Sequence, residues 1–491
     1  MSVLTLFHNG DRREIPFTAP QPLHEILRSA GIPADHPCGG KGQCGKCSVR
    51  LAGQVAAPTA AEIAAGTRLS CQAVLMGDAT VWVEHAALTQ IETVSHRLAS
   101  VAPMSGVYGA AVDIGTTTIA LTLCRLSDGA MLASTTGENP QRSIAADVIG
   151  RMEAVMSGKL HALQDMVLSA VQSLLTSACR KADIEEALVE SLVITGNTTM
   201  LYLLTGKDPE PLSHAPFKAD CLFGYETTIL GRTAYLPPCM DAFVGADITC
   251  AVLASAMAEN TKAALLCDIG TNGEVALWKD GILSVTSTAA GPAFEGAGIS
   301  CGCGSIPGAI DKVFSEDGQV RCHTIGDAPA VGLCGSGLID AIAVFLRTED
   351  IDETGAADGD LYLAENVRLI PKDIRAVQLA KAAIAAGIQT LLETTRTEEE
   401  DLSDFYICGG FGAHLNLDSA ANIGLIPRSL VEKVRVLGNA ALSGAMMLLL
   451  DTGCRAKAEQ LAKASQQLNL GGNPKFNENY IDQMFFPEEV M

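Results

Sequence analysis

The sequence predicts a small α+β domain followed by a large α/β domain with an internal duplication, and three observations support this. The 491 residues suffice for about three folding units. Residues 1–95 carry a net charge of −1, whereas residues 96–491 carry −21. Two segments about 155 residues apart share one layout, GAAVDIGTTTIALTL at 109–123 and AALLCDIGTNGEVAL at 263–277. Such an internal repeat indicates two related halves in the larger domain.

The N-terminal segment reads as strands and one helix. Residues 2–8 alternate as a strand does, Asn9-Gly10-Asp11 supplies turn residues, and residues 13–17 can pair back. A helix is predicted over 22–31, with a proline near its start and a glycine at its end. After a loop rich in glycine and cysteine, strands are predicted at 47–51 and 79–84. We therefore place one α+β domain at 1–95 and a polar linker at 96–106.

The larger domain is predicted from the change in residue pattern near Tyr108. Apolar, β-branched runs broken by glycine alternate with helical stretches, as in α/β proteins with buried strands. The repeat divides this region into a first half at 107–260 and a second half at 261–491. A cleft between the two halves is expected.

Composition excludes several classes of partner. The chain has 34 Lys and Arg against 56 Asp and Glu, a net charge of −22. Such a field repels nucleic-acid phosphates and anionic lipids, so we expect no nucleic-acid or membrane partner. No apolar run is long enough for a bilayer and no signal peptide is evident, which predicts a cytoplasmic protein. The 16 cysteines are then expected to be thiols or metal ligands.

Four cysteines form the strongest metal-binding pattern. Cys38, Cys44 and Cys47 are spaced C-x5-C-x2-C, and Cys71 follows. Four thiolates satisfy a cluster of two irons and two sulfides, and the glycines between them let the backbone fold closely around it. A zinc site is the alternative, but zinc ligands usually come as two C-x2–4-C pairs. The loop resembles the two-iron two-sulfur ferredoxins, which implies the β-grasp fold for this domain.

The two Asp-Ile-Gly-Thr segments predict a phosphate site. In each, a strand ends at an aspartate, a glycine allows a close turn, and hydroxyls and N–H groups follow that can hold phosphate. Asp113 and Asp268 would face each other across the cleft, where they can hold Mg²⁺ with its waters or orient an attacking water. The predicted catalytic residues are therefore Asp113 and Asp268.

Further glycine motifs extend this site. They are VITGNTTML at 193–201, VGADI at 244–248, YICGGFGAHL at 406–415 and LGNAALSGAMMLL at 437–449. In this order, the motifs resemble the superfamily of actin, sugar and acetate kinases and heat-shock ATPases. The resemblance implies an actin-like ATPase fold that binds ATP with Mg²⁺. The residues that it places around the nucleotide, besides the two aspartates, are Gly115, Thr116, Thr117, Gly270, Thr271, Asn272, Gly409 and Gly410.

The combination of both domains, with SVTSTAAGPAFEGAGIS at 284–300 and VGLCGSGLIDAI at 331–342, resembles the reductive activators of corrinoid-dependent methyltransferases. The resemblance implies a function: one low-potential electron from the cluster, with ATP, restores Co(II) corrinoid to Co(I). It implies a corrinoid protein and an upstream electron donor as partners, and it leaves a homodimer open. We expect the corrinoid-facing surface at Ser287, Thr288 and Glu295, although a loop packed inside the domain is the alternative for these residues.

Two other functions are considered. Activators of 2-hydroxyacyl-CoA dehydratases share the ATPase fold but lack the ferredoxin loop, so the N-terminal domain disfavours that reading. A redox-sensing ATPase or a small-molecule kinase is the other, and a kinase would need a base, for which Asp247 is the candidate.

Overall fold

A computed structural model describes residues 2–8, 11–30, 47–65, 67–83, 107–316, 318–410 and 415–488. Cys38, Cys44 and the predicted linker lie outside these residues. The chain forms two compact units, of which one comprises Met1–Ala87 with Asn139–Val167 and the other Leu88–Glu138 with Leu168–Met491.

The N-terminal domain is a mixed sheet with the strand order β2-β1-β6-β4-β5, and β3 pairs with β6. β1 runs antiparallel to β2 and parallel to β6, while β4 is antiparallel to β6. The elements are β1 (Ser2–His8), β2 (Asp11–Phe17), β3 (Gln21–Pro22), α1 (Leu23–Ser29), β4 (Ser48–Val55), α2 (Ala60–Ala65), β5 (Arg68–Leu69) and β6 (Val74–Val83). The predicted hairpin, helix and returning strands are present, whereas α2, β3 and β5 were not predicted.

Residue spacing explains how this small domain forms its core. Alternate residues of β1 point to one face of the sheet, so Leu4 and Leu6 are both buried. In α1, apolar residues at helical spacing form one stripe. Leu23, Ile26 and Leu27 of that stripe join the same core.

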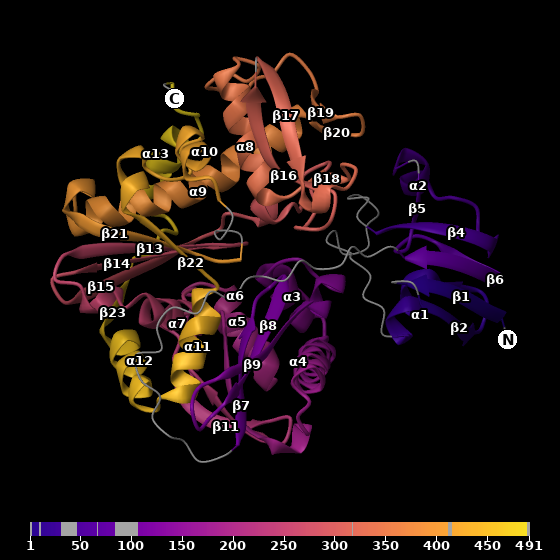
Figure 1. Ribbon diagram of the computed structural model, residues 1–491, viewed down its shortest axis with the longest axis horizontal. Coiled ribbons are helices and arrows are strands. Elements are labelled where there is room, and N and C mark those ends of the chain that lie inside the picture. Colours follow the sequence, from indigo (N-terminus) through magenta and orange to yellow (C-terminus); the bar gives the residue numbers. More distant parts are fainter. Residues whose placement is uncertain are drawn as a thin grey trace. The chain divides into compact units, whose positions relative to one another are not determined.

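The larger domain contains two sheets of matching topology. Their strand orders are β11-β12-β10-β7-β8-β9 and β22-β21-β13-β14-β15-β23. In each, three consecutive antiparallel strands are followed by two parallel strands beside the first, so β7-β8-β9 corresponds to β13-β14-β15 (Figure 1). The sheets confirm the duplication predicted from the repeated segments.

Each half of this domain contributes its own strands and helices. The first half contains β7 (Tyr108–Ile114), β8 (Thr118–Arg125), β9 (Met131–Glu138), α3 (Val148–Met156), α4 (Leu160–Ala182), β10 (Val189–Gly196), α5 (Thr198–Thr205), α6 (Glu210–Ser213), β11 (Tyr225–Ile229), β12 (Arg232–Leu236) and α7 (Ala246–Ser255). The second half contains β13 (Ala263–Ile269), β14 (Gly273–Lys279), β15 (Ile282–Thr288), β16 (Ala309–Glu316), β17 (Gln319–Thr324), β18 (Gly332–Leu333), α8 (Gly335–Arg347), β19 (Leu361–Ala364), β20 (Val367–Leu369), α9 (Pro371–Thr395), β21 (Leu402–Cys408), α10 (Leu417–Asn422), β22 (Val434–Gly438), α11 (Ala440–Leu450), α12 (Gly453–Ala464), β23 (Ser465–Gln467) and α13 (Pro474–Asp482).

Helices α7 and α11 join the two halves. They cross side by side (Figure 1), and a Cβ added to Gly444 of α11 would lie 2.1 Å from the carbonyl oxygen of Cys250 in α7. Although α11 follows the second sheet in the chain, its Leu442 and Leu449 share a core with Val193 of the first sheet. Glycine at this position therefore sets how closely the two helices approach.

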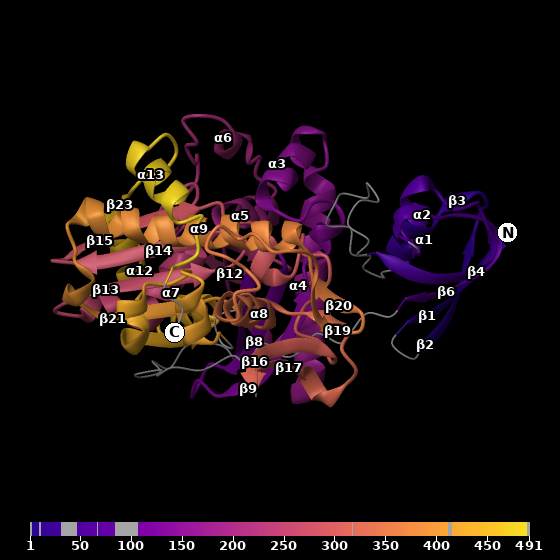
Figure 2. The ribbon, with the colours of Figure 1, turned by 90° about the horizontal axis from the view of Figure 1, so that it is seen from above.

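The second sheet is covered on both faces. Alternate residues of β13 belong to different cores: Leu265 packs with α8 and α9, and Leu266 packs with α7. Helix α13 lies against α9 (Figure 2). Among the described residues, no helix combines the length and apolar character that a membrane span requires.

Candidate functional site: a cysteine pair and two facing phosphate loops

The described part of the cysteine site contains Cys47 and Cys71. Cys47 directly precedes β4, and its carbonyl oxygen accepts a hydrogen bond of 2.8 Å from the N–H of Ser70. This bond holds the two cysteines together, with their Sγ atoms 3.2 Å apart. Two sulfurs this close suit two ligands of one iron. The described residues contain no group of three or more metal-binding side chains, and Cys38 and Cys44 lie outside them.

The two repeated segments form tight turns of one type. In the first, between β7 and β8, the N–H of Gly115 donates to the carbonyl oxygen of Thr118 at 3.0 Å. In the second, between β13 and β14, the N–H of Gly270 donates to the carbonyl oxygen of Asn272 at the same distance. A Cβ at Gly115 would lie 2.7 Å from the Thr118 oxygen, so the first turn requires glycine.

The structure brings these two turns together. The Oγ1 atoms of Thr116 and Thr271 lie 3.1 Å apart, and both side chains are buried. Asp113 and Asp268 are close enough for the charge of Asp113 to raise the pKa of Asp268. The Nδ2 atom of Asn439, the N-cap of α11, donates to Oδ2 of Asp113 at 2.9 Å. The sequence analysis gave Asn439 no role, although its LGN motif was noted.

Four carboxyl groups surround these turns, of which Glu274 is buried and the three aspartates are half-buried. Burial raises the pKa of Asp113 to about 6, against the lowering effect of the Asn439 hydrogen bond. Burial, and then the charges of Asp113 and Glu295, raise the pKa of Asp268 to about 7. Burial, and then the charges of Asp113 and Asp268, raise the pKa of Asp247 to about 8.

The fourth carboxyl group is Glu274, which the sequence analysis missed. Burial, and then the charges of Asp247 and Asp268, hold its pKa well above the usual range, although hydrogen bonds from Asn272 and Ser287 oppose this. Glu274 lies inside the repeated segment 263–277, but the corresponding part of the first copy has no acid, so the repeat did not single it out. A divalent cation held through its own waters, and not by a set of direct ligands, would relieve the repulsion between these carboxylates.

The glycine pair after β21 lies beside the second turn. Gly409 has a φ of +96°, and a Cβ there would approach the carbonyl oxygen of Ile269 to 2.7 Å and Oδ1 of Asp268 to 2.8 Å. Its N–H donates to the carbonyl oxygen of Gly438. Gly410 follows and is exposed, and the next four residues are outside the described chain. The backbone therefore passes close to Asp268, where a side chain has no room.

The three residues expected to face a corrinoid have partners inside this domain. Thr288 is buried, and its hydroxyl donates to the carbonyl oxygen of Gly273. Ser287 donates to Oε1 of Glu274 at 3.3 Å. Glu295 accepts hydrogen bonds from both phosphate turns. These contacts favour the alternative of a loop packed inside the domain, and the corrinoid-facing role stays a prediction.

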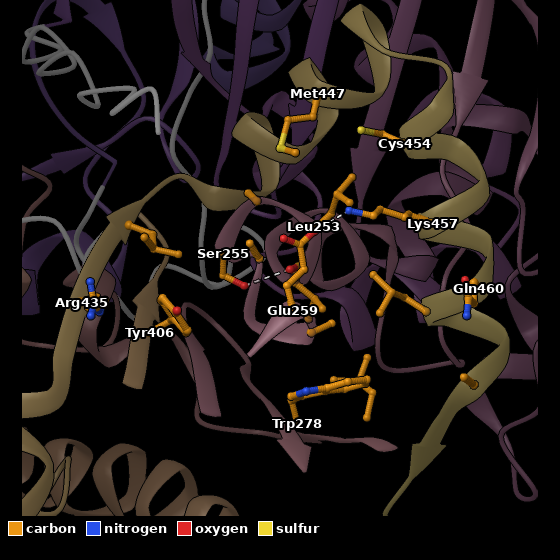
Figure 3. A pocket seen from close by; sticks show the side chains of 18 of the residues that line it. Leu253, Ser255, Glu259, Trp278, Tyr406, Arg435, Met447, Cys454, Lys457 and Gln460 are labelled. Atoms are coloured by element: carbon orange, nitrogen blue, oxygen red, sulfur yellow. Dashed lines mark hydrogen bonds and ion pairs between the residues drawn. The ribbon is translucent and has the colours of Figure 1, made fainter. Parts of the chain in front are cut away.

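One cavity lies away from the phosphate turns. It measures about 1020 Å³ and is enclosed by α7, α12, β22 and neighbouring strands. Trp278, Tyr406 and Met447 line it, and an ion pair between Lys457 and Glu259 lies at its wall (Figure 3). None of the residues predicted to bind nucleotide lines it.

Three family descriptions match successive parts of the chain. They are a 2Fe-2S iron-sulfur cluster binding domain over residues 6–76, the RACo middle region over 108–260, and the C-terminal domain of RACo, the ASKHA domain, over 262–491. They confirm the predicted fold class, a ferredoxin domain followed by an ASKHA-type ATPase domain. The first match also supports the two-iron cluster over zinc.

Named relatives and one solved structure extend these matches. The corrinoid activation enzyme RamQ of Eubacterium limosum is 32% identical over 78% of this chain and 71% of its own. A [Co(II) methylated amine-specific corrinoid protein] reductase of Methanosarcina barkeri is 27% identical over 62% of this chain and 64% of its own. The structure of a reductive activator for a corrinoid, iron-sulfur protein matches with a TM-score of 0.73 and 27% identity, covering 99% of this chain and 98% of that one.

Proposed function

The chain belongs to the family of reductive activators of corrinoid proteins, and we propose that it reduces the Co(II) corrinoid of a methyltransferase system to Co(I) at the expense of ATP. The observation that carries this proposal is the union, in one chain, of a ferredoxin domain with two facing phosphate turns. A ferredoxin alone would not need the turns, and a kinase would not need the cluster. The ferredoxin match also disfavours a dehydratase activator.

We assign the electron-carrying role to the N-terminal domain. A two-iron cluster, when bound, supplies one electron at a time at low potential, and Co(II) takes up that electron to become Co(I). Cys38, Cys44, Cys47 and Cys71 would be its ligands. The 3.2 Å separation of the Cys47 and Cys71 sulfurs supports their share of this assignment.

We assign nucleotide binding to the two turns and the glycine pair. Asp113 and Asp268 would hold Mg²⁺ through its waters, and the raised pKa values of these two neighbouring carboxyl groups support this role. The remaining proposed nucleotide-binding residues are Gly115, Thr116, Thr117, Gly270, Thr271, Asn272, Gly409 and Gly410.

An energetic argument indicates why ATP is used. One electron corresponds to about 1.4 kcal/mol per 59 mV. A binding coupling of about 1–3 kcal/mol therefore shifts a potential by only about 40–130 mV. Hydrolysis of ATP to ADP and phosphate supplies a larger driving force for a docked state in which the electron moves.

The partners and the location complete the proposal. A corrinoid protein receives the electron and an upstream low-potential donor refills the cluster. We propose a cytoplasmic location, because that compartment keeps cysteines reduced and available as cluster ligands. A homodimer is an arrangement that light scattering would test directly.

The central experiment mixes the holoprotein, MgATP, a low-potential artificial reductant and a Co(II) corrinoid protein, and follows the visible spectrum. We expect the Co(I) band to form only when ATP is present. The proposal is wrong if the band never exceeds the ATP-free control with any cognate corrinoid protein.

A cysteine variant separates the two domains. Cys71→Ala should abolish the two-iron EPR signal and Co(I) formation while nucleotide binding is retained, because the phosphate turns belong to the other domain. Cys221→Ala, a thiol of the ATPase domain, is the matched control and should keep the EPR signal. Loss of nucleotide binding together with the cluster in Cys71→Ala would contradict the division of roles.

A further inference from the structure

Glu295 links the two phosphate turns. Its Oε2 atom accepts a hydrogen bond of 2.5 Å from Oγ1 of Thr117, in the turn of the first half. Its Oε1 atom accepts a hydrogen bond of 2.9 Å from Oγ1 of Thr271, in the turn of the second half. One carboxylate thus accepts hydrogen bonds from a threonine hydroxyl of each turn.

The backbone holds Glu295 in this position. It ends a short 3-10 helix, Pro292–Glu295, in which the neighbouring Phe294 is 1% exposed and packs in the core of the second half. Gly296 has a φ of +76°, and a Cβ there would lie 2.6 Å from the carbonyl oxygen of Cys303. At the other end, the N–H of Gly291 donates to the carbonyl oxygen of Thr271 at 2.9 Å. The segment 291–296 is therefore tied to the second phosphate turn through both side chain and backbone.

A phosphate between the turns would compete with this carboxylate. Each threonine hydroxyl has a single proton to donate, so it cannot serve Glu295 and a phosphate oxygen at once. A carboxylate beside a phosphate would also add a like charge to a site that already contains Asp113 and Asp268. The described geometry and a phosphate bound to Thr117 and Thr271 exclude each other.

We propose that Glu295 is an internal substitute for the terminal phosphate of ATP and that nucleotide binding displaces it. The carboxylate joins the two turns as described above, and a bound triphosphate would take over the hydroxyls of Thr117 and Thr271. Displacement of Glu295 moves the segment 291–296 to which it belongs. Glu295 is thus a positioning residue that converts nucleotide occupancy into movement of this segment. This inference rests on the proposed nucleotide site at the two turns.

Binding measurements on Glu295→Gln test the competition. The amide has no charge and accepts less strongly, so a non-hydrolysable ATP analogue should bind about tenfold tighter than to the wild type, within the range of ordinary coupling between sites. The affinity for ADP, which lacks the terminal phosphate, should differ between the variant and the wild type by less than about twofold. Glu316→Gln is the matched control, because that carboxylate is exposed and lies 3.9 Å from Nε of Arg321, away from the phosphate turns.

The outcomes separate this inference from the proposed function. Weaker binding of the ATP analogue to Glu295→Gln, or an equal change for ATP analogue and ADP, overturns the role of Glu295. Wild-type protein that binds no adenine nucleotide overturns the proposed function itself.

Hydrogen exchange on the wild-type holoprotein gives a second test that needs no variant. The N–H groups of Gly291, Gly296 and Ala297 donate to the carbonyl oxygens of Thr271, Ala293 and Pro292, respectively. We expect faster exchange of these amides with the ATP analogue and no change with ADP. Equal or slower exchange with the ATP analogue would show that the segment stays in place, which the proposal forbids.

Discussion

The two halves of the ATPase domain have the same strand order but use corresponding positions differently. Each half follows its last parallel strand with a connecting helix, α7 in the first and α11 in the second. The N-cap of α7 is Gly245, whereas that of α11 is Asn439, which donates to Asp113 across the cleft. Helix α7 instead contributes the acid Asp247 to the same site. A duplicated fold has thus placed a neutral donor on one side and a carboxyl group on the other.

The phosphate turns differ in the same way. Asp113 of the first turn accepts a hydrogen bond from Asn439, which lowers its pKa. For Asp268 of the second turn, the charges of Asp113 and Glu295 add to the effect of burial and raise the pKa further. Glu295 itself belongs to the second half and reaches both turns. We infer that the first half mainly binds and that the second half carries the response to the nucleotide.

The largest expected effect comes from neutralising the two aspartates. Asp113→Asn and Asp268→Asn should each lower ATP hydrolysis about 100-fold or more, because a catalytic metal ion contributes several kcal/mol. The double variant should be little worse than the poorer single variant if both act on one ion. Both variants should raise the melting temperature of the nucleotide-free protein, because each removes a buried charge.

Asp128→Asn, on the exposed turn between β8 and β9, is the control and should leave hydrolysis unchanged. Steady-state ATPase rates and thermal melts check these expectations. A wild-type rate of ATP hydrolysis in either aspartate variant would contradict this expectation, because the half that contains that aspartate would then contribute no essential carboxylate.

The sequence predicted the turns well because their signal is local. A strand, an aspartate, a glycine and a threonine lie within a few residues, and the second copy repeats them. The bond between Thr117 and Glu295 joins residues 178 positions apart, so no spacing rule could reveal it. From the sequence, Glu295 was therefore expected at the corrinoid-facing surface. In the structure it lies between the two turns.

In the N-terminal domain, too, only local sequence patterns predicted the structure. Alternation in residues 2–8 and the turn residues Asn9-Gly10-Asp11 predicted the hairpin. The segment with α2 had no such pattern, and its structure depends on Glu62, which is buried and accepts hydrogen bonds from Arg68 and the N–H of Leu69. A buried carboxylate with partners several residues away leaves no trace in hydrophobic periodicity.

A smaller effect is expected at the crossing of the connecting helices. Counted from their N-caps, Cys250 in α7 and Gly444 in α11 occupy the same position, and the crossing brings these two residues into contact. Gly444→Ala should lower the free energy of unfolding by about 1–3 kcal/mol, since the added methyl group forces the helices apart. Gly304→Ala, whose Cβ would meet nothing within 4 Å, is the control. Chemical denaturation of both variants measures the difference, and equal stability would mean that the helices can separate freely.

The smallest expected effect is a change in pH dependence at Asp247. Its folded pKa of about 8 lies above the ordinary value of 3.8, so the folded protein keeps a proton that the unfolded chain has released. This group therefore stabilises the nucleotide-free protein most at low pH, and the contribution is lost as pH rises through the window from about 4 to 8. Asp247→Asn should raise the melting temperature more at pH 8 than at pH 5.5, whereas Asp128→Asn should not. A shift of the same size at both pH values would show that Asp247 is ionised throughout, which contradicts its raised pKa.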